Sequence, residues 1–409
     1  MGVWALFLGI IALIETIKQG LLRNPMIKFL SEPEYVNNRN KIQSASLITN
    51  ILFSLLVIFC IIFGDHILVK WLNTPALYPL VQWGILLILL LIPFNHFEVL
   101  LQAHFKFRHI FYGYFFRQGV FLACVVFLLI FHKPTLTLIN LVKLQILALT
   151  CGAAVLLYFA REYFYRRFDV EKKTMLRMFH FGKYIFGTNV FSAFGRSADQ
   201  FITAGLISPE VVAYYNVVAR INNMMDVPSI AVADVLFPKN VEAMVNSGEE
   251  KVRYYFERTV GSIISILAPI SLLIFLMPHL FIMILAGNKY YAAVPILQIV
   301  ILFSFLRPFS YQFGATMDAI GKPKINFWVN LLSMCLNYSC MYIGLRYTWM
   351  GAAYGAVVSA ILSFSIMFAV LNKTIGVNLR ETFRYVGFAY KEMFQIIKKL
   401  LNKKDNPLA

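Results

Sequence analysis

The sequence predicts an all-α, polytopic membrane protein, and three observations support this fold class. Hydrophobic residues make up 59% of the 409 residues and charged residues only 14%, with a mean hydropathy of +0.69. This composition lies outside the range of soluble domains. The apolar residues form runs about as long as a bilayer-spanning helix, which needs about 20 residues. Lys and Arg lie between these runs and not in one patch, so the net charge of +17 does not indicate nucleic-acid binding.

We expect about eleven spans and no soluble domain. Their ranges are 2–16, 42–64, 80–101, 117–132, 139–160, 183–207, 211–236, 259–277, 295–318, 326–346 and 351–371. The loops on one side hold 29 Lys and Arg residues, against four on the other side. Because cytoplasmic loops are enriched in these residues, we expect the C-terminus in the cytoplasm. The first span starts abruptly at Met1, and we expect it to follow a missing first helix of a twelve-helix plan.

A faint internal repeat predicts two pseudo-symmetric helix bundles around a central cavity, as in many transporters. The first bundle is expected at 1–180, the second at 181–371, and a basic cytoplasmic tail at 372–409. Residues 377–402 have the pattern of a basic amphipathic helix on the inner leaflet, and a solvated tail explains them equally well. Four prolines are expected to kink or break spans: Pro93, Pro228, Pro269 and Pro308.

The spans on either side of Pro209 carry several ionisable residues: Arg196, Asp199, Arg220, Asp226 and Asp234. Asp199 stands ten residues before Pro209 and Arg220 eleven residues after it. Two antiparallel helices would therefore hold these opposite charges at one depth, roughly 15 Å from the turn. Arg196 shares a helical face with Asp199. Because ionisable groups at membrane depth usually face a bundle interior or a wet cavity, this hairpin is predicted to form a polar pathway or an ion-paired structural element.

Short motifs, strongest between 181 and 330, carry a family resemblance. They are Ser197-Ala198-Asp199-Gln200-Phe201, Gly205-Leu206-Ile207-Ser208-Pro209-Glu210, Ala213-Tyr214-Tyr215-Asn216, Ala219-Arg220, Val235-Leu236-Phe237-Pro238, Leu285-Ala286-Gly287-Asn288-Lys289-Tyr290, Ala293-Val294-Pro295-Ile296-Leu297 and Ala319-Ile320-Gly321-Lys322-Pro323. The sequence resembles the bacterial oligosaccharide flippases, the Wzx-type polysaccharide transporters of the multidrug/oligosaccharidyl-lipid/polysaccharide exporter superfamily. The resemblance implies a protein of the bacterial cytoplasmic membrane. It also implies passage of an undecaprenyl-diphosphate-linked oligosaccharide from the inner to the outer leaflet, for O-antigen, capsule or exopolysaccharide synthesis, with other glycan-assembly membrane proteins as candidate partners.

A diphosphate that crosses hydrocarbon needs countercharge, and arginine pairs with phosphate oxygens bidentately. We therefore expect a substrate-binding cavity lined by Arg196, Asp199, Arg220, Asn223 and Arg307. The alternative is that these charges pair with each other and only hold the bundle together. Glu15, Glu98 and Asp226 are candidates for proton or sodium coupling, because burial raises a carboxylate pKa. In the plainer interpretation Glu15, Glu98 and Asp234 lie near the cytoplasmic ends of spans and pair with loop lysines.

No motif for catalysis, nucleotide-sugar binding or metal ligation is present in the sequence. We therefore expect a transporter and not an enzyme, with no cofactor and no metal. Three alternatives remain open: a cation-coupled small-molecule antiporter of the same superfamily, a peptidoglycan-precursor flippase, and a non-transporting scaffold for glycan assembly. The many basic residues favour an anionic lipid carrier over a cationic drug.

Overall fold

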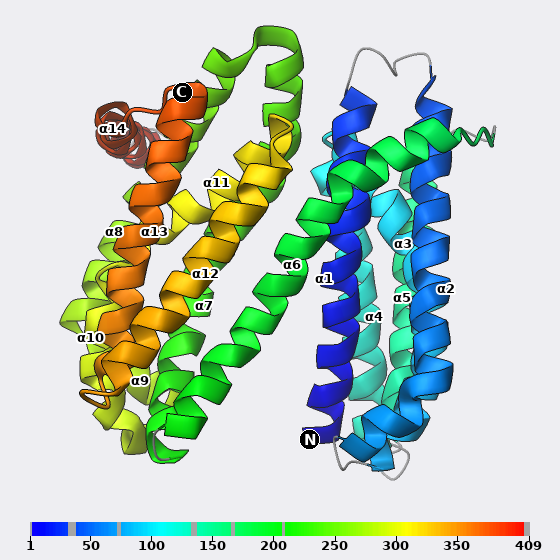
Figure 1. Cartoon of the computed structure of the whole chain (residues 1–409), viewed down its shortest axis with the longest axis horizontal. Helices are drawn as coiled ribbons and strands as arrows, with labels where there is room; N and C mark the ends of the chain where they lie inside the picture. The colour runs from blue at the N-terminus through cyan, green and yellow to red at the C-terminus, as the bar shows by residue number, and fades with distance from the viewer. Residues whose placement is uncertain are drawn as a thin grey trace. The chain divides into compact units, whose positions relative to one another are not determined.

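The computed structural model describes residues 2–31, 38–71, 75–131, 137–164, 168–206 and 209–404 (Figure 1). Within these ranges the regular elements are fourteen α-helices and a few short 3-10 helices, so the predicted all-α fold is confirmed. The chain forms two compact units, Met1–Val190 and Phe191–Ala409, here called unit 1 and unit 2. The division between them falls within the long helix α6 (Lys172–Leu206).

Six helices in the described ranges are long and apolar enough to cross a membrane. A seventh candidate is a bent pair of segments, Asn288–Ile301 and Ser304–Ala319, which meet at 41°. Five less apolar helices in the described ranges also have the length of a span: α1, α6, α7, α12 and α14 contain 30, 35, 39, 23 and 26 residues. The protein is therefore a multi-pass membrane protein, and the number of eleven spans stays a prediction.

Unit 1 is built around α3 (Tyr78–Ala103). Its other helices are α1 (Gly2–Ser31), α2 (Arg39–Trp71), α4 (Phe107–Phe131), α5 (Leu138–Ala160) and the first half of α6. Helix α3 packs against α1, α2 and α5 and buries apolar residues along its length, including Leu80, Leu91 and Phe94. By contrast, α4 buries only Gly113 among its residues. Such an exposed apolar helix is stable in lipid, where outward apolar side chains are not exposed to water.

Several helices are longer than the apolar runs that predicted them. Helix α4 begins at Phe107 and not near 117, because the chain turns tightly at Phe105, which has a φ of 56°. The amide of Lys106 donates to the Leu101 carbonyl at 2.9 Å and closes this turn. Helix α6 begins at Lys172 and not at 183. Hydropathy locates the part of a helix inside hydrocarbon, whereas backbone hydrogen bonds continue the helix into the polar region beyond it.

Unit 2 contains the second half of α6 and eight further helices. These are α7 (Pro209–Ser247), α8 (Glu249–Leu276), α9 (Pro278–Ala286), α10 (Val294–Ile301), α11 (Arg307–Ala319), α12 (Pro323–Leu345), α13 (Gly351–Ile375) and α14 (Leu379–Lys404). One cluster of buried apolar residues joins α7, α8, α9 and α10, with Leu267 and Leu297 among its members. A second joins α8, α11 and α13 around Phe256, Phe313 and Leu371.

The four prolines expected to disturb spans behave differently. Pro93, Pro228 and Pro269 lie inside the continuous helices α3, α7 and α8. Pro308 stands in the first turn of α11, directly after the irregular segment that separates α10 from α11. A proline at this position loses no helical hydrogen bond. The 41° bend lies between Ile301 and Ser304, a few residues before Pro308, so the expected break falls near this proline but not at it.

Helices α12 and α13 form a close antiparallel hairpin. A Cβ added at Gly355 would overlap the Cys340 carbonyl, and one added at Gly351 would overlap the Gly344 carbonyl. The small-residue pattern from Gly351 to Gly355 predicts close helix packing, as in other membrane proteins, and this prediction is confirmed.

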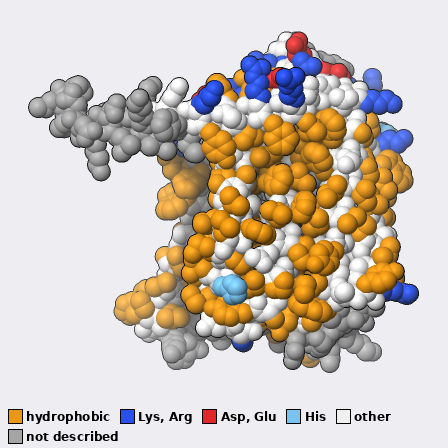
Figure 2. Space-filling view, turned by 90° about the vertical axis from the view of Figure 1, so that its left-hand side faces the viewer, with side chains coloured by type: hydrophobic (Ala, Val, Ile, Leu, Met, Phe, Trp, Pro, Cys, Tyr) orange, Lys and Arg blue, Asp and Glu red, His pale blue; other side chains and the backbone are white. Residues whose placement is uncertain are grey.

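Helix α14 differs from the other long helices of unit 2 in direction. In Figure 1 it is seen nearly end-on beside the end of α13, so it runs across the long helices. On the face of unit 2 shown in Figure 2, hydrophobic side chains cover a broad band, and Lys and Arg gather above this band. This is the distribution expected of a membrane-facing surface with one basic edge.

Candidate functional site

Helix α7 presents two contrasting faces in unit 2. One face is buried and carries Ile221, Met225 and Ser229 together with the polar residues Asn222 and Asp226. The other face is exposed, and its residues recur at intervals of three or four: Arg220, Asn223, Met224, Val227 and Ile230. The side chains of Met224 and Val227 are each 61% exposed. A polar arginine and asparagine therefore stand on a helical face that the rest of the described chain does not cover.

Asp226 on the buried face forms an ion pair with Arg307. The Arg307 Nη2 atom lies 3.1 Å from Asp226 Oδ2, and the Arg307 and Asp226 side chains are 39% and 6% exposed, respectively. Arg307 is the first residue of α11 and directly follows the 3-10 helix Ser304–Leu306, which lies between the bend and α11. The Tyr311 hydroxyl, one turn further along α11, also hydrogen-bonds to the Asp226 carboxylate. The pair is thus buried on the carboxylate side and open on the guanidinium side.

Further polar contacts hold α7 against α11 beyond this pair. The Gln312 amide donates to the Ser229 carbonyl at 3.0 Å, and the Asn240 amide donates to Thr316 Oγ1 at 3.0 Å. Hydrogen bonds between helices are a common source of specificity in membranes, where water is absent as a competitor. They fix the register of α11 on α7 and so fix where Arg307 meets Asp226.

Two arginines that the sequence predicted in one cavity stand beside different faces of α7, and their sharing of one cavity stays a prediction. Arg220 and Asp226 are six residues apart on α7, which places them roughly 120° apart around the helix. Arg307 contacts the Asp226 side, whereas Arg220 and Asn223 lie on the exposed side. The backbones of Arg196 and Asp199 belong to α6, but their side chains lie outside the described residues. Pairing of Asp199 with Arg196 or Arg220 therefore stays a prediction.

In unit 1, both candidate coupling carboxylates have partners from α4. Arg117 Nη2 lies 3.2 Å from Glu15 Oε1, and its guanidinium stands over the Phe94 ring at 5.0 Å. The Tyr114 hydroxyl donates to Glu98 Oε1 at 3.0 Å. Glu15 and Glu98 therefore bond to side chains of a neighbouring helix, and their roles in ion coupling or in pairing with loop lysines stay predictions.

One basic residue near this cluster, Lys18, was expected in the cytoplasmic loop after the first span, and the structure places it within a helix. Lys18 lies in the middle of α1, is fully buried, and donates from Nζ to Ser54 Oγ at 2.9 Å. The signal for Lys18 was its position three residues after Glu15, which places both on one helical face. Because the apolar run ends at residue 16, Lys18 was predicted to lie outside the span.

Tyr214 and Tyr215 have structural contacts in unit 2. The Tyr215 hydroxyl donates to the Trp349 carbonyl at 3.0 Å and accepts from the Ala353 amide at 3.2 Å. It thereby fastens α7 to the turn between α12 and α13. The Tyr214 ring meets the Tyr290 ring edge to face at 6.5 Å. Of the polar residues on this part of α7, Arg220 and Asn223 have exposed side chains in the part of the chain that the structure describes.

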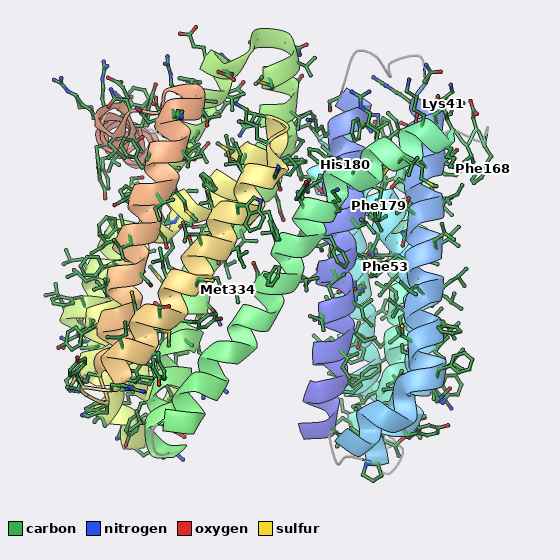
Figure 3. All side chains as sticks on the ribbon, viewed as in Figure 1. Lys41, Phe53, Phe168, Phe179, His180 and Met334 are labelled. Atoms are coloured by element: carbon green, nitrogen blue, oxygen red, sulfur yellow. The ribbon has the colours of Figure 1, made fainter. Side chains whose placement is uncertain are left out.

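One end of unit 1 carries titratable groups outside the spans. Lys41, which is labelled in Figure 3 near the start of α2, lies 3.3 Å from Glu171, just before α6. The hydrogen bond from Lys41 lowers the pKa of the Glu171 carboxyl. His104 lies in the turn after α3, where burial lowers its imidazole pKa below the ordinary value of 6.5. Its Nδ1 atom lies 2.8 Å from the Leu100 carbonyl.

Comparison with known proteins places the chain in a family. A family model described as "Polysaccharide biosynthesis protein" matches residues 2–295. The chain belongs to this polysaccharide biosynthesis family. It is also 22% identical over 400 residues to the lipopolysaccharide biosynthesis protein WzxC of Escherichia coli (strain K12), covering 93% of this chain and 76% of WzxC. The resemblance found in the sequence motifs is thereby confirmed.

Solved transporter structures share the fold. An outward-facing multidrug resistance MATE family transporter of the MOP superfamily matches with a TM-score of 0.77 at 13% identity, covering 91% of this chain and 88% of the transporter. A mutant of the Vibrio cholerae MATE transporter VcmN matches with a TM-score of 0.76 at 13% identity, with the same coverage. The polysaccharide biosynthesis protein described here therefore has the fold of a MOP-superfamily membrane transporter.

Proposed function

We propose that this protein flips an undecaprenyl-diphosphate-linked oligosaccharide from the inner to the outer leaflet of the bacterial cytoplasmic membrane. The observation that carries the proposal is the exposed face of α7, where Arg220 and Asn223 stand side by side in a member of a polysaccharide biosynthesis family. An uncovered arginine within a predicted span is costly unless it meets water or an anion. A lipid-linked diphosphate supplies that anion.

Each residue of this face has a chemical role in the proposal. The Arg220 guanidinium pairs bidentately with diphosphate oxygens and neutralises the charge that must cross the membrane. Asn223 lies one turn along the same face and hydrogen-bonds to the first sugar. Arg196 and Asp199 on α6 join the site on the strength of their sequence positions. Because the recognised group is shared by all such carriers, this site selects the diphosphate and leaves the sugar sequence to other residues.

The Asp226–Arg307 pair provides a switch for this site. Arg307 is partly exposed and Asp226 is buried, so Arg307 is able to leave Asp226 for an incoming phosphate. Asp226 then loses its countercharge inside the bundle and takes up a proton or a cation, because an isolated buried carboxylate is unfavourable. Substrate binding and ion uptake are thereby coupled through one arginine. Glu15 and Glu98, which pair with Arg117 and Tyr114, are the corresponding coupling candidates of unit 1.

The proposed cycle is alternating access with the C-terminus in the cytoplasm, the orientation that the distribution of Lys and Arg indicates. Other glycan-assembly membrane proteins are proposed partners, because they deliver the lipid-linked precursor on one side and consume it on the other. No cofactor is required by this cycle.

The proposal is tested by surface glycan export in a strain that lacks its own flippase and carries this gene. Arg220→Ala and Asn223→Ala are compared with Lys239→Ala, an exposed cation further along α7. We expect Arg220→Ala to lower export at least tenfold with unchanged membrane abundance, Asn223→Ala to lower it less, and Lys239→Ala to leave it unchanged. Normal export by Arg220→Ala would contradict the proposed site. If the protein instead restores growth of a peptidoglycan-flippase mutant but exports no surface glycan, the alternative function of peptidoglycan-precursor flippase is supported.

A further inference from the structure

We propose that α14 is an interfacial helix that binds the anionic phospholipid surface of the membrane and anchors unit 2 there. This role is separate from the flipping of substrate, because the residues that carry it lie on neither α7 nor α11. The proposal rests on the direction of α14, on its attachment to α8, and on the order of side chains around it.

The direction of α14 is that of a helix lying in a membrane plane. It runs across the long helices of unit 2 in Figure 1, beside the end of α13. Helices such as α8 and α13 have the composition of membrane spans. A helix that crosses them at one end therefore lies along the membrane surface, as amphipathic helices with a basic polar face do.

Specific contacts attach the start of α14 to α8 and fix its rotation. The buried Glu257 carboxylate of α8 accepts a hydrogen bond from the backbone N–H of Asn378 at 2.8 Å. The side chain of Asn378 in turn accepts from the Arg380 amide at 2.9 Å, at the first turn of α14. A Cβ added at Gly261 of α8 would lie 2.7 Å from the Thr382 carbonyl, so the two helices cross in direct backbone contact.

Three stripes of side chains follow from this attachment. Phe383 and Tyr390, seven residues apart, form an aromatic stripe on one side and are 53% and 38% exposed. Arg380, Arg384 and Lys391 form a basic stripe that faces away from α8. Glu381, Phe388 and Glu392 form the third stripe, on the far side of the basic one. These spacings of seven, four and eleven residues each bring side chains to one helical face.

The order of the stripes determines which side meets the bilayer. Both acidic side chains lie in the third stripe, whereas the aromatic stripe contains no charge among the described residues. The aromatic stripe therefore points into the acyl layer, the basic stripe lies at the level of the headgroups, and the third stripe faces water.

Charge selects an anionic lipid surface as the partner. Lys251 and Arg258 of α8 are also exposed beside this helix, and Lys373 precedes it. On the acidic side, Glu381 is paired with Arg384 at 3.3 Å and Glu250 with Arg253 at 3.5 Å. The remaining excess of positive charge favours phosphatidylglycerol-type headgroups over zwitterionic ones, by roughly 1 kcal/mol for each basic residue at the surface, or about fivefold.

The test measures the depth of two matched positions in the full-length protein. Phe383 and Phe388 are the same residue type on one helix, with similar exposure of 53% and 49%, but they lie on opposite sides of the basic stripe. Phe383→Cys and Phe388→Cys are made separately in a protein without its five native cysteines and carry a spin label. The protein is reconstituted into nanodiscs of phosphatidylcholine with or without phosphatidylglycerol, after size exclusion shows that each variant is folded.

We expect the label at 383 to be accessible to oxygen and protected from a water-soluble nickel relaxant, and the label at 388 to show the reverse. The inserted population at 383 should fall on the order of tenfold when R380Q/K391Q is added, and stay constant with K289Q/R346Q, which removes two cations elsewhere in unit 2. Water exposure at both positions would overturn the proposal and indicate a solvated tail or a protein-binding helix. Insertion that is equal in both lipid mixtures would overturn the anionic selectivity.

Discussion

Asp226 and Arg307 differ in exposure, and this difference determines how much folding stability is lost when either partner is removed. Without Arg307, the Asp226 carboxylate, whose side chain is 6% exposed in the intact pair, loses its countercharge inside the bundle. Loss of one partner of a buried ion pair costs about 3–5 kcal/mol in soluble proteins. Without Asp226, the Arg307 guanidinium, whose side chain is 39% exposed, has access to solvent or headgroups. The two substitutions are therefore not equivalent.

We predict that Arg307→Ala lowers the thermal stability of the purified protein far more than Asp226→Ala does. The double variant should recover most of the stability lost by Arg307→Ala, since it contains no unpaired buried charge. Thermal unfolding in detergent, together with membrane abundance, measures the four members of this cycle. Equal losses from the two single substitutions, or additive losses in the double variant, would show that the pair contributes little.

The candidate site shows why sequence reasoning succeeds only in part at the residue scale. The sequence identified Asp226 and Arg307 as ionisable residues within spans, and it assigned them separate roles. Spacing along one helix predicts neighbours at three or four residues, as for Arg196 and Asp199, but it does not reveal which helices pack together. The contact between Asp226 on α7 and Arg307 on α11 depends on tertiary packing, and so does that between Glu15 and Arg117.

At the scale of elements, the α12–α13 hairpin depends on the absence of side chains at its crossing. We predict that Gly355→Ala destabilises the protein by about 1–3 kcal/mol, because its Cβ would overlap the Cys340 carbonyl and force the helices apart. Gly119→Ala in α4 is the matched control, since no atom lies within 4 Å of its added Cβ. In the control, helix propensity should leave stability unchanged or raise it by up to about 1 kcal/mol. Thermal unfolding of both variants makes the comparison, and equal effects would contradict the close crossing.

The turn between α3 and α4 is predicted to make unit 1 sensitive to acid. Burial lowers the His104 pKa in the folded protein, so the unfolded chain binds the proton more readily. Stability is therefore full above the ordinary pKa of 6.5 and falls as the pH drops toward the lowered value. His104→Gln should flatten this part of the profile of unfolding temperature against pH. An unchanged slope in the variant would assign the acid sensitivity to other groups.

The elements themselves were largely predictable, and their limits were not. Apolar runs indicated the long helices, Pro308 lies close to the break before α11, and the basic periodicity after 377 indicated α14 (Leu379–Lys404). Helices α1, α4 and α6 extend beyond the predicted spans, because helical hydrogen bonds continue where hydropathy falls. For this reason Lys18 was expected in a loop, although it lies within α1.

At the scale of the whole molecule, the distribution of Lys and Arg predicts the orientation in the membrane. A single cysteine at position 289 should react with a membrane-impermeant reagent added to intact cells, and one at position 173 should react only after permeabilisation. Lys289 belongs to the side with four basic residues and Lys173 to the side with 29. Labelling of position 173 in intact cells would reverse the orientation and with it the proposed direction of transport.

The central claim is that this member of the polysaccharide biosynthesis family moves a lipid-linked diphosphate sugar across a bilayer with the help of Arg220. The most direct measurement uses the purified full-length chain in proteoliposomes with a fluorescent polyprenyl-diphosphate disaccharide and a membrane-impermeant quencher. We predict transbilayer movement well above that of protein-free liposomes, at least tenfold slower movement with Arg220→Ala, and no change with Lys239→Ala. Movement at the protein-free rate, or equal movement by the wild-type protein and Arg220→Ala, would contradict the claim.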